Sequence, residues 1–163
     1  MRFQQTTVCL VLAFLACSKV QAETCILELS EFRSGKPLTR LELKGPPYIF
    51  TIAFTHSVLN TPVSDRYIWQ PDKKVGHARI VEELFEGEGY GLPDNAAPGE
   101  IFERIQTDDG PRWRLSLDRR VEPLAVLPLA SQKMRIEITG QPAVLLGSLS
   151  NKTILVQGSG CNQ

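Results

Sequence analysis

The chain has no charge excess, few histidines and only one apolar run of note. Lys plus Arg and Asp plus Glu both number 18 among 163 residues, and no basic cluster stands out, so a nucleic-acid-binding function is disfavoured. The two histidines and four cysteines do not have the spacing of zinc ligands. We therefore expect no nucleic acid partner, no metal and no cofactor.

The longest apolar run lies close to the N-terminus, from Val8 to Cys17. It is too short for a membrane-spanning helix, which needs about 20 residues. Arg2 precedes it, and Val20-Gln21-Ala22 offers small residues where a signal peptidase cuts. We expect a secretory signal peptide over residues 1–22 and one domain over residues 23–163, exported in soluble form to the periplasm.

A second cleavage site competes with the first. Phe14-Leu15-Ala16-Cys17 resembles a lipoprotein processing box, although Phe14 and Leu15 fit that box poorly. Cleavage there would leave a lipid on Cys17 and anchor the protein to a membrane.

Two cysteines, Cys25 and Cys161, remain in the exported chain after either cleavage. They lie near its two ends. Exported proteins commonly pair such cysteines, so a Cys25–Cys161 disulfide is the prediction, with two free thiols as the alternative.

Short runs of alternating apolar and polar residues recur along the chain. Trp113, Leu115 and Leu117 fall on one face of such a run, after a turn at Thr107–Pro111. The same period of two occurs over residues 25–30, 40–44 and 134–139, and apolar runs follow at Leu124–Ala130, Ala143–Leu149 and Thr153–Gln157. The spacing predicts an all-β, single-domain antiparallel β-sandwich or partly open barrel, with room for one short helix.

The segment HARIVEELFEGEG is ambiguous. Ile80 and Leu84, like Val81 and Phe85, recur four residues apart, which is helical spacing. We favour a strand that leads into a glycine-rich loop and retain a short helix as the alternative. His77, at the start of this segment, is expected to be solvated.

The stretch FTHSVLNTPVSDRYIW contains the other histidine. Residues 48–57 read as a strand with the apolar side chains on one face, and 48–69 as a hairpin turning at Asn60–Pro62. His56 continues the apolar face and Ser57 points the other way, so a His–Ser dyad is disfavoured. We expect His56 to hydrogen-bond to backbone groups or to Thr61, with ligand contact, metal ligation and acid–base chemistry as alternatives.

Three glycines alternate in the stretch Phe85–Pro93. They permit unusual backbone angles or a nest of backbone N–H groups that binds an anion. Glu86 and Glu88 would repel an anion, so a solvated glycine-rich turn is favoured. A calcium site built from the glutamates of residues 82–88 is a further alternative.

The motifs T-H-S-V-x-x-T-P-V at Thr55–Val63 and F-x-x-x-G-x-G-L-P at Phe85–Pro93 together resemble a bacterial family of unknown function, DUF1850. The resemblance covers about residues 25–140. It implies a small secreted or envelope protein whose gene often accompanies a TRAP-type solute transporter, with no established activity. The chain departs from the family at Ser64 and Asp65, where glutamate is common, and at Gly87, where serine or threonine is common.

The motif positions form a hypothetical binding patch. It comprises His56, Ser57, Thr61, Pro62, Gly89, Gly91, Leu92 and Pro93. We expect the two motifs to meet in space, because the segment between them has the length to run out and back to one edge of a sheet.

A non-catalytic periplasmic accessory or binding protein is the favoured function. Its partners would be membrane or solute-binding subunits of a TRAP-type transporter, and any small-molecule ligand is unknown. The alternatives are a small hydrolase or transferase that uses His56 with Asp65 or another acidic partner, and a purely structural envelope protein.

Overall fold

A computed structural model describes residues 24–72 and 76–161. The predicted signal peptide, residues 1–22, and the alternative lipidation site Cys17 lie outside these residues. Within them, no helix has the length and apolar character needed to cross a membrane.

The described chain is built mainly from strands. In chain order the elements are β1 (Thr24–Glu31), β2 (Pro37–Lys44), β3 (Tyr48–Thr55), β4 (Pro62–Gln70), β5 (His77–Phe85), β6 (Ile101–Thr107), β7 (Gly110–Val121), β8 (Leu124–Val126), the 3-10 helix η1 (Ala130–Gln132), β9 (Arg135–Glu137), β10 (Val144–Leu145), α1 (Leu146–Leu149) and β11 (Ile154–Ser159).

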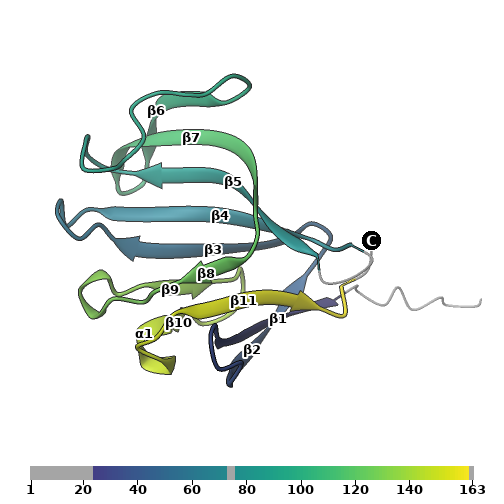
Figure 1. The fold of residues 1–163 in the computed structure, drawn as a ribbon. Helices are drawn as coiled ribbons and strands as arrows, with labels where there is room; N and C mark the ends of the chain where they lie inside the picture. The colour runs from purple at the N-terminus through teal and green to yellow at the C-terminus, as the bar shows by residue number, and fades with distance from the viewer. Residues whose placement is uncertain (1–23, 73–75, 162–163) are drawn as a thin grey trace, which may run out of the picture.

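The strands form two antiparallel sheets (Figure 1). One has the order β2-β1-β11-β8 and the other the order β10-β9-β3-β4-β5-β7-β6. Side chains from both sheets meet in one apolar core, which includes Leu27 of β1, Phe50 of β3 and Leu115 of β7. This sandwich-like arrangement confirms the predicted all-β antiparallel fold with one short α-helix.

Several local predictions are confirmed. Residues 77–85 form a strand rather than a helix, and β3 and β4 form the predicted hairpin. In the run Ala143–Leu149, however, β10 is short and α1 follows it at once. The apolar spacing of Leu145, Leu146 and Leu149 fits either structure, so composition alone could not separate them.

The expectation for His77 was wrong. It is the first residue of β5, and its side chain is only 13% exposed, with Nδ1 lying 3.9 Å from an oxygen of Asp72. The basic residues around it in the sequence suggested a solvated loop, but pairing of His77 with Gln70 of β4 draws it into the sheet.

Cys25 and Cys161 are bonded, as predicted, across a sequence separation of 136 residues. β1 and β11 are antiparallel neighbours, with Ile26 opposite Ser159. The disulfide therefore fastens the first strand to the segment that follows the last.

Register shifts in β4 and β5 decide which side chains of the large sheet face the core. β5 pairs with β7 through a shift between Ile80 and Glu82. An extra residue at such a bulge lets two positions an odd number apart share a face. Ile80 and Glu83 consequently both face inward, Ile80 as part of the core and Glu83 opposite buried Leu115.

Candidate functional site

The hairpin between β3 and β4 closes in a tight loop that begins at His56. The His56 amide donates to the carbonyl of Thr61 (2.8 Å), and the Asn60 amide donates to the carbonyl of His56 (2.9 Å). Asn60 adopts a left-handed backbone conformation with φ of 56°, which asparagine tolerates better than most residues. These bonds fix the position of His56 just after the end of β3.

Both ring nitrogens of His56 bond to backbone groups. Nδ1 accepts from the amides of Val58 (3.3 Å) and Leu59 (3.2 Å), and Nε2 lies 3.3 Å from the carbonyl oxygen of Tyr90. Because a carbonyl only accepts, Nε2 carries the proton and donates it, while Nδ1 is the unprotonated acceptor. His56 thus joins its own loop to a second loop 34 residues away.

The second loop follows β5 and has an unusual run of backbone angles. Gly87, Gly89 and Gly91 have φ of 92°, 73° and 89°, and Tyr90 between them has φ of 53°. The Leu92 amide closes a turn on the carbonyl of Gly89 (3.1 Å). The side chain of Tyr90 is 71% exposed, so the loop holds an aromatic ring in solvent on a backbone that L-residues rarely adopt.

Two further contacts join the loops. The Thr61 hydroxyl donates to the carbonyl of Glu86 (2.9 Å), and a Cβ on Gly87 would lie 2.8 Å from Cδ1 of Leu59. Val63 of β4 also pairs with Phe85 of β5. The predicted meeting of the two motifs is therefore confirmed, and we call residues 56–61 and 86–93 the loop pair.

The predicted patch residues differ in exposure. His56, Thr61, Leu92 and Pro93 are half-buried, whereas Ser57, Pro62, Gly89 and Gly91 are exposed. The exposed side chains of Tyr90 and Val58 (55%) lie next to the His56 contacts. Tyr90 is the largest exposed group of the loop pair, and sequence reasoning missed it because a tyrosine between glycines could equally turn inward.

The geometry does not favour a reaction centre at His56. Within residues 24–72 and 76–161, its ring makes no hydrogen bond to Ser57 or to any carboxylate. Pro62 stands opposite Thr55, the residue before His56. Asp65 lies three residues further along β4, about 10 Å from Pro62 at strand spacing. A general base needs a free lone pair within hydrogen-bond reach of its substrate, and Nδ1 already receives two amides.

The glutamates of residues 82–88 are divided between the two faces of the sheet. Glu82 pairs with Arg66 (3.2 Å), Glu86 lies 3.7 Å from Arg112, and Glu83 faces inward. Among the residues that the structure describes, no three His, Cys, Asp or Glu side chains are close enough to hold a metal ion. The arrangement gives no support to the calcium alternative.

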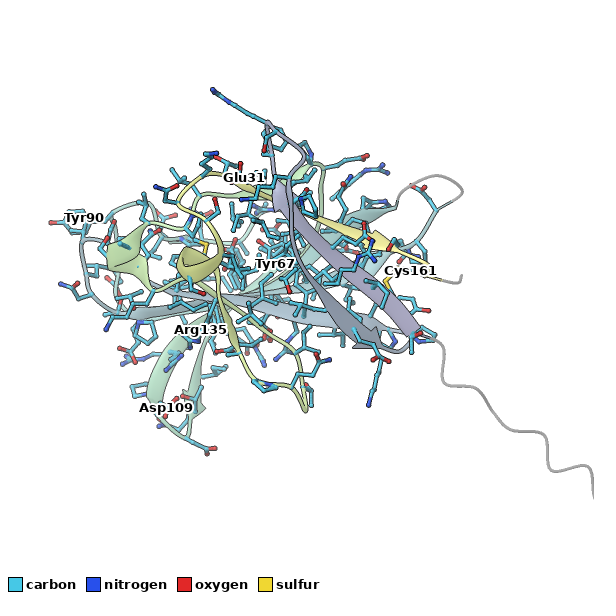
Figure 2. The ribbon with its side chains drawn as sticks, turned by 90° about the horizontal axis from the view of Figure 1, so that it is seen from below. Glu31, Tyr67, Tyr90, Asp109, Arg135 and Cys161 are labelled. Atoms are coloured by element: carbon cyan, nitrogen blue, oxygen red, sulfur yellow. A yellow bond between two sulfur atoms is a disulfide. The ribbon has the colours of Figure 1, made fainter. Side chains whose placement is uncertain are left out.

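A carboxylate pair on the inner face of the large sheet was not predicted. Asp65 of β4 stands directly opposite Glu83 of β5, and the hydroxyl of Tyr67 hydrogen-bonds to Asp65. Burial, and then the charge of Glu83, raise the pKa of Asp65 to about 7. Burial likewise raises the pKa of Glu83, which Arg119 opposes. Figure 2 shows Tyr67 within the molecule and Tyr90 at its periphery.

A sequence signal for this pair existed. In PVSDRYIWQ, Asp65 falls on the same alternating face as Val63, Tyr67 and Trp69, all of which are buried. An acidic residue at a core-facing position indicates a carboxyl group whose pKa is perturbed by burial. Sequence reasoning considered Asp65 only as a partner for His56, and the bulge that turns Glu83 inward leaves no obvious pattern.

Comparison with known proteins identifies one family. A family model described as "Domain of unknown function (DUF1850)" matches residues 50–145. The match contains both loops of the pair and the Asp65–Glu83 pair, but neither cysteine of the disulfide. No curated protein and no solved structure matches the chain.

Proposed function

Because the chain belongs to the DUF1850 family, we propose that it is a non-catalytic binding or accessory protein of the cell envelope. In this proposal residues 1–22 direct its export, the disulfide forms in the oxidising periplasm, and the loop pair is the surface that meets a partner. The proposed partner is a membrane or solute-binding subunit of a TRAP-type transporter.

The bonding of His56 is the observation that carries the proposal. Its ring links the amides of one motif to the carbonyl of Tyr90 in the other. This use of both nitrogens builds a defined surface rather than a proton-transfer site.

The shape of the loop pair fits recognition. Tyr90 is displayed on a left-handed backbone that the neighbouring glycines permit, and its carbonyl is bonded to His56. An exposed tyrosine on a rigid support suits protein recognition, because little side-chain entropy is lost when it enters a partner's pocket.

The hydrolase or transferase alternative loses its support at His56. The pKa of Asp65, about 7, suits proton transfer, but neither Asp65 nor Glu83 is among the residues that line the cavities described for this fold. The binding function is therefore the better reading of this geometry.

Co-purification tests the proposal. The tagged protein is co-expressed with a TRAP-type transporter of the source organism, and detergent-solubilised membranes are passed over a resin that binds the tag. We expect the wild type to retain transporter subunits and Tyr90→Gly to retain at least tenfold less. Glycine removes the ring while making the left-handed backbone easier to adopt.

Two variants complete the experiment. Ile101→Ser removes another exposed apolar side chain (60%) from β6 and serves as the matched control. His56→Asn keeps an acceptor for the two amides but loses the Tyr90 contact, and it should show an intermediate loss. Absence of transporter subunits from the wild-type sample, or equal retention by Tyr90→Gly, would reject the proposal.

A further inference from the structure

Large apolar side chains gather in solvent at the end of the molecule near α1. Phe32 is 44% exposed, and Leu127, Leu129 and Leu145 are each 47% exposed. They come from three separate segments: the turn after β1, the loop after β8, and β10. Together with nearby cations they form what we call the basal face: Phe32, Arg33, Lys36, Leu127, Leu129, Lys133, Leu145 and Lys152.

Backbone contacts and two cavities connect neighbouring parts of this face. The Phe32 amide donates to the carbonyl of Thr153 (2.8 Å), and the Leu129 amide donates to that of Leu127 (3.0 Å). A cavity of about 460 Å³ is lined by Glu31, Arg33, Ser34, Leu127, Lys152 and Thr153. A second cavity, of about 330 Å³, has Leu129, Lys133 and Leu145 among its lining residues.

The charge on this face is positive. The carboxylate of Glu31 is buried and accepts hydrogen bonds from Lys152 Nζ (2.8 Å) and the Ser34 hydroxyl (2.8 Å). The positive charge of Lys152 therefore offsets the negative charge of Glu31. Arg33, Lys36 and Lys133 are exposed and add to the field. The nearby Arg135 and Glu137 of β9 pair with each other (2.5 Å) and cancel. In Figure 2, Glu31 is labelled next to the turn between β1 and β2, near the edge of the view.

We propose that the basal face is a peripheral membrane-binding surface that rests on an anionic lipid bilayer. Leucine and phenylalanine side chains would enter the headgroup region, and the flanking lysines and arginine would meet lipid phosphates. The long basic side chains suit this position, because their stems lie on apolar surface while their charged ends reach outward.

The layout favours a bilayer over an acidic protein. A protein interface needs a contiguous, closely packed apolar centre. Here the apolar side chains stand on separate turns around two cavities. A fluid lipid surface accommodates such scattered groups without a matching shape. The inference is independent of the loop pair, because no residue of the basal face belongs to it.

Vesicle co-sedimentation with the purified protein tests the inference. The probes are vesicles of phosphatidylglycerol mixed equally with phosphatidylcholine, vesicles of phosphatidylcholine alone, and beads coated with polyglutamate, which sediment as the vesicles do. We expect sedimentation with the anionic vesicles and not with the neutral ones. Binding should weaken as salt is raised from about 0.05 to 0.5 M, because screening shortens the range of the charges.

Matched pairs of variants separate charge from insertion. R33Q/K36Q should weaken binding to anionic vesicles roughly fivefold for each charge removed, whereas R66Q/R104Q on β4 and β6 should bind as the wild type. L127S/L129S should weaken it at least tenfold, whereas I49S/I101S should not. Lys152 is left intact because its loss would strand the buried Glu31 carboxylate. Thermal melting of each variant confirms that it folds.

Each result of the vesicle experiment either supports or overturns the membrane-binding inference. Wild-type binding to anionic vesicles, lost in the two basal variants and kept in their controls, supports the inference. Equal loss in a basal variant and its control, or no vesicle binding at all, overturns it. Binding to polyglutamate without vesicle binding also overturns it and assigns the face to an acidic protein partner. Failure here leaves the loop-pair proposal standing, since that proposal is read out by transporter retention.

Discussion

Asp65 and Glu83 face each other across β4 and β5 on the side of the large sheet that carries the core. Two half-buried carboxylates in register repel each other when both are ionised, and each loses hydration on folding. Tyr67 donates a hydrogen bond to one member, and Arg119 lies near the other. The charge state of this pair therefore links the folded state to pH.

The first prediction is that Asp65 makes the protein less stable as pH rises toward neutrality. Its pKa is raised from 3.8 to about 7 in the folded chain. The folded state then holds a proton that the unfolded chain has already released. This contribution to the free energy of unfolding is complete below about pH 4 and is lost by about pH 7, with a slope of at most about 1.4 kcal/mol per pH unit.

Asp65→Asn tests this pH dependence. Urea unfolding between pH 4.5 and 8.5 should give a wild-type free energy that falls relative to that of Asp65→Asn. In Glu83→Gln the free energy of unfolding should fall less steeply with pH than in the wild type. The charge that helps to raise the pKa of Asp65 is then absent. Parallel curves for the wild type and Asp65→Asn would contradict the assignment.

The second prediction compares two glycines in the same loop. Gly87→Ala meets both a left-handed backbone and the side chain of Leu59, whereas Gly89→Ala meets only the backbone requirement, since nothing lies within 4 Å of its added Cβ. The backbone term is about 1–2 kcal/mol for each. Gly87→Ala should therefore be the more destabilising, by about 1 kcal/mol, in chemical denaturation. Adding Leu59→Ala to both variants should remove that difference. Equal destabilisation by Gly87→Ala and Gly89→Ala alone would mean that the Leu59 side chain shifts without cost.

The third prediction concerns Gly158 of β11. A Cβ there would lie 2.3 Å from Nε1 of Trp69, whose indole is 3% exposed and fills the core. Gly158→Ala should lower the free energy of unfolding by at least about 2 kcal/mol, because a buried ring must shift. Gly147→Ala, in open space on α1, is the control. Far-UV circular dichroism during urea titration measures both, and a neutral Gly158→Ala would show that the indole packs elsewhere.

The fourth prediction concerns the disulfide. In the chain-entropy model a loop as long as that between Cys25 and Cys161 stabilises the fold by up to about 5 kcal/mol. Cys25→Ser/Cys161→Ser should lower the urea midpoint accordingly, and the denatured, unreduced wild type should show no free thiol at these positions. Labelling of both cysteines before reduction would contradict the bond.

Much of the fold could be predicted because it depends on local alternation. Leu27 and Leu29 on β1, and Leu115 and Leu117 on β7, are buried as their period of two requires. The hairpin turn at residues 108–109 follows from its Asp-Asp-Gly sequence. These features arise within single strands and turns, where side-chain direction is set by chain geometry.

What could not be predicted depends on non-local pairing. The bulges at Arg66/Tyr67 and Ile80/Glu82 change the register between strands, and no local pattern reports them. The Asp65–Glu83 opposition is a product of those shifts. The bond from His56 to Tyr90 likewise joins two loops whose separation is set by the pairing of β3, β4 and β5. The sequence therefore predicted that the two motifs meet, but not this bond.

The Cys25–Cys161 bond also has a mechanical meaning. A pull applied to the chain before Cys25 and after Cys161 passes through the sulfur bridge and not through the sheets, because the bridge is the shortest covalent path between the two points. The chain between the two cysteines, which contains the rest of β1 and strands β2 to β11, then carries none of the applied force. Tension from a tether at either end would leave the loop pair, the basal face and the carboxylate pair in their resting geometry until the bridge is reduced.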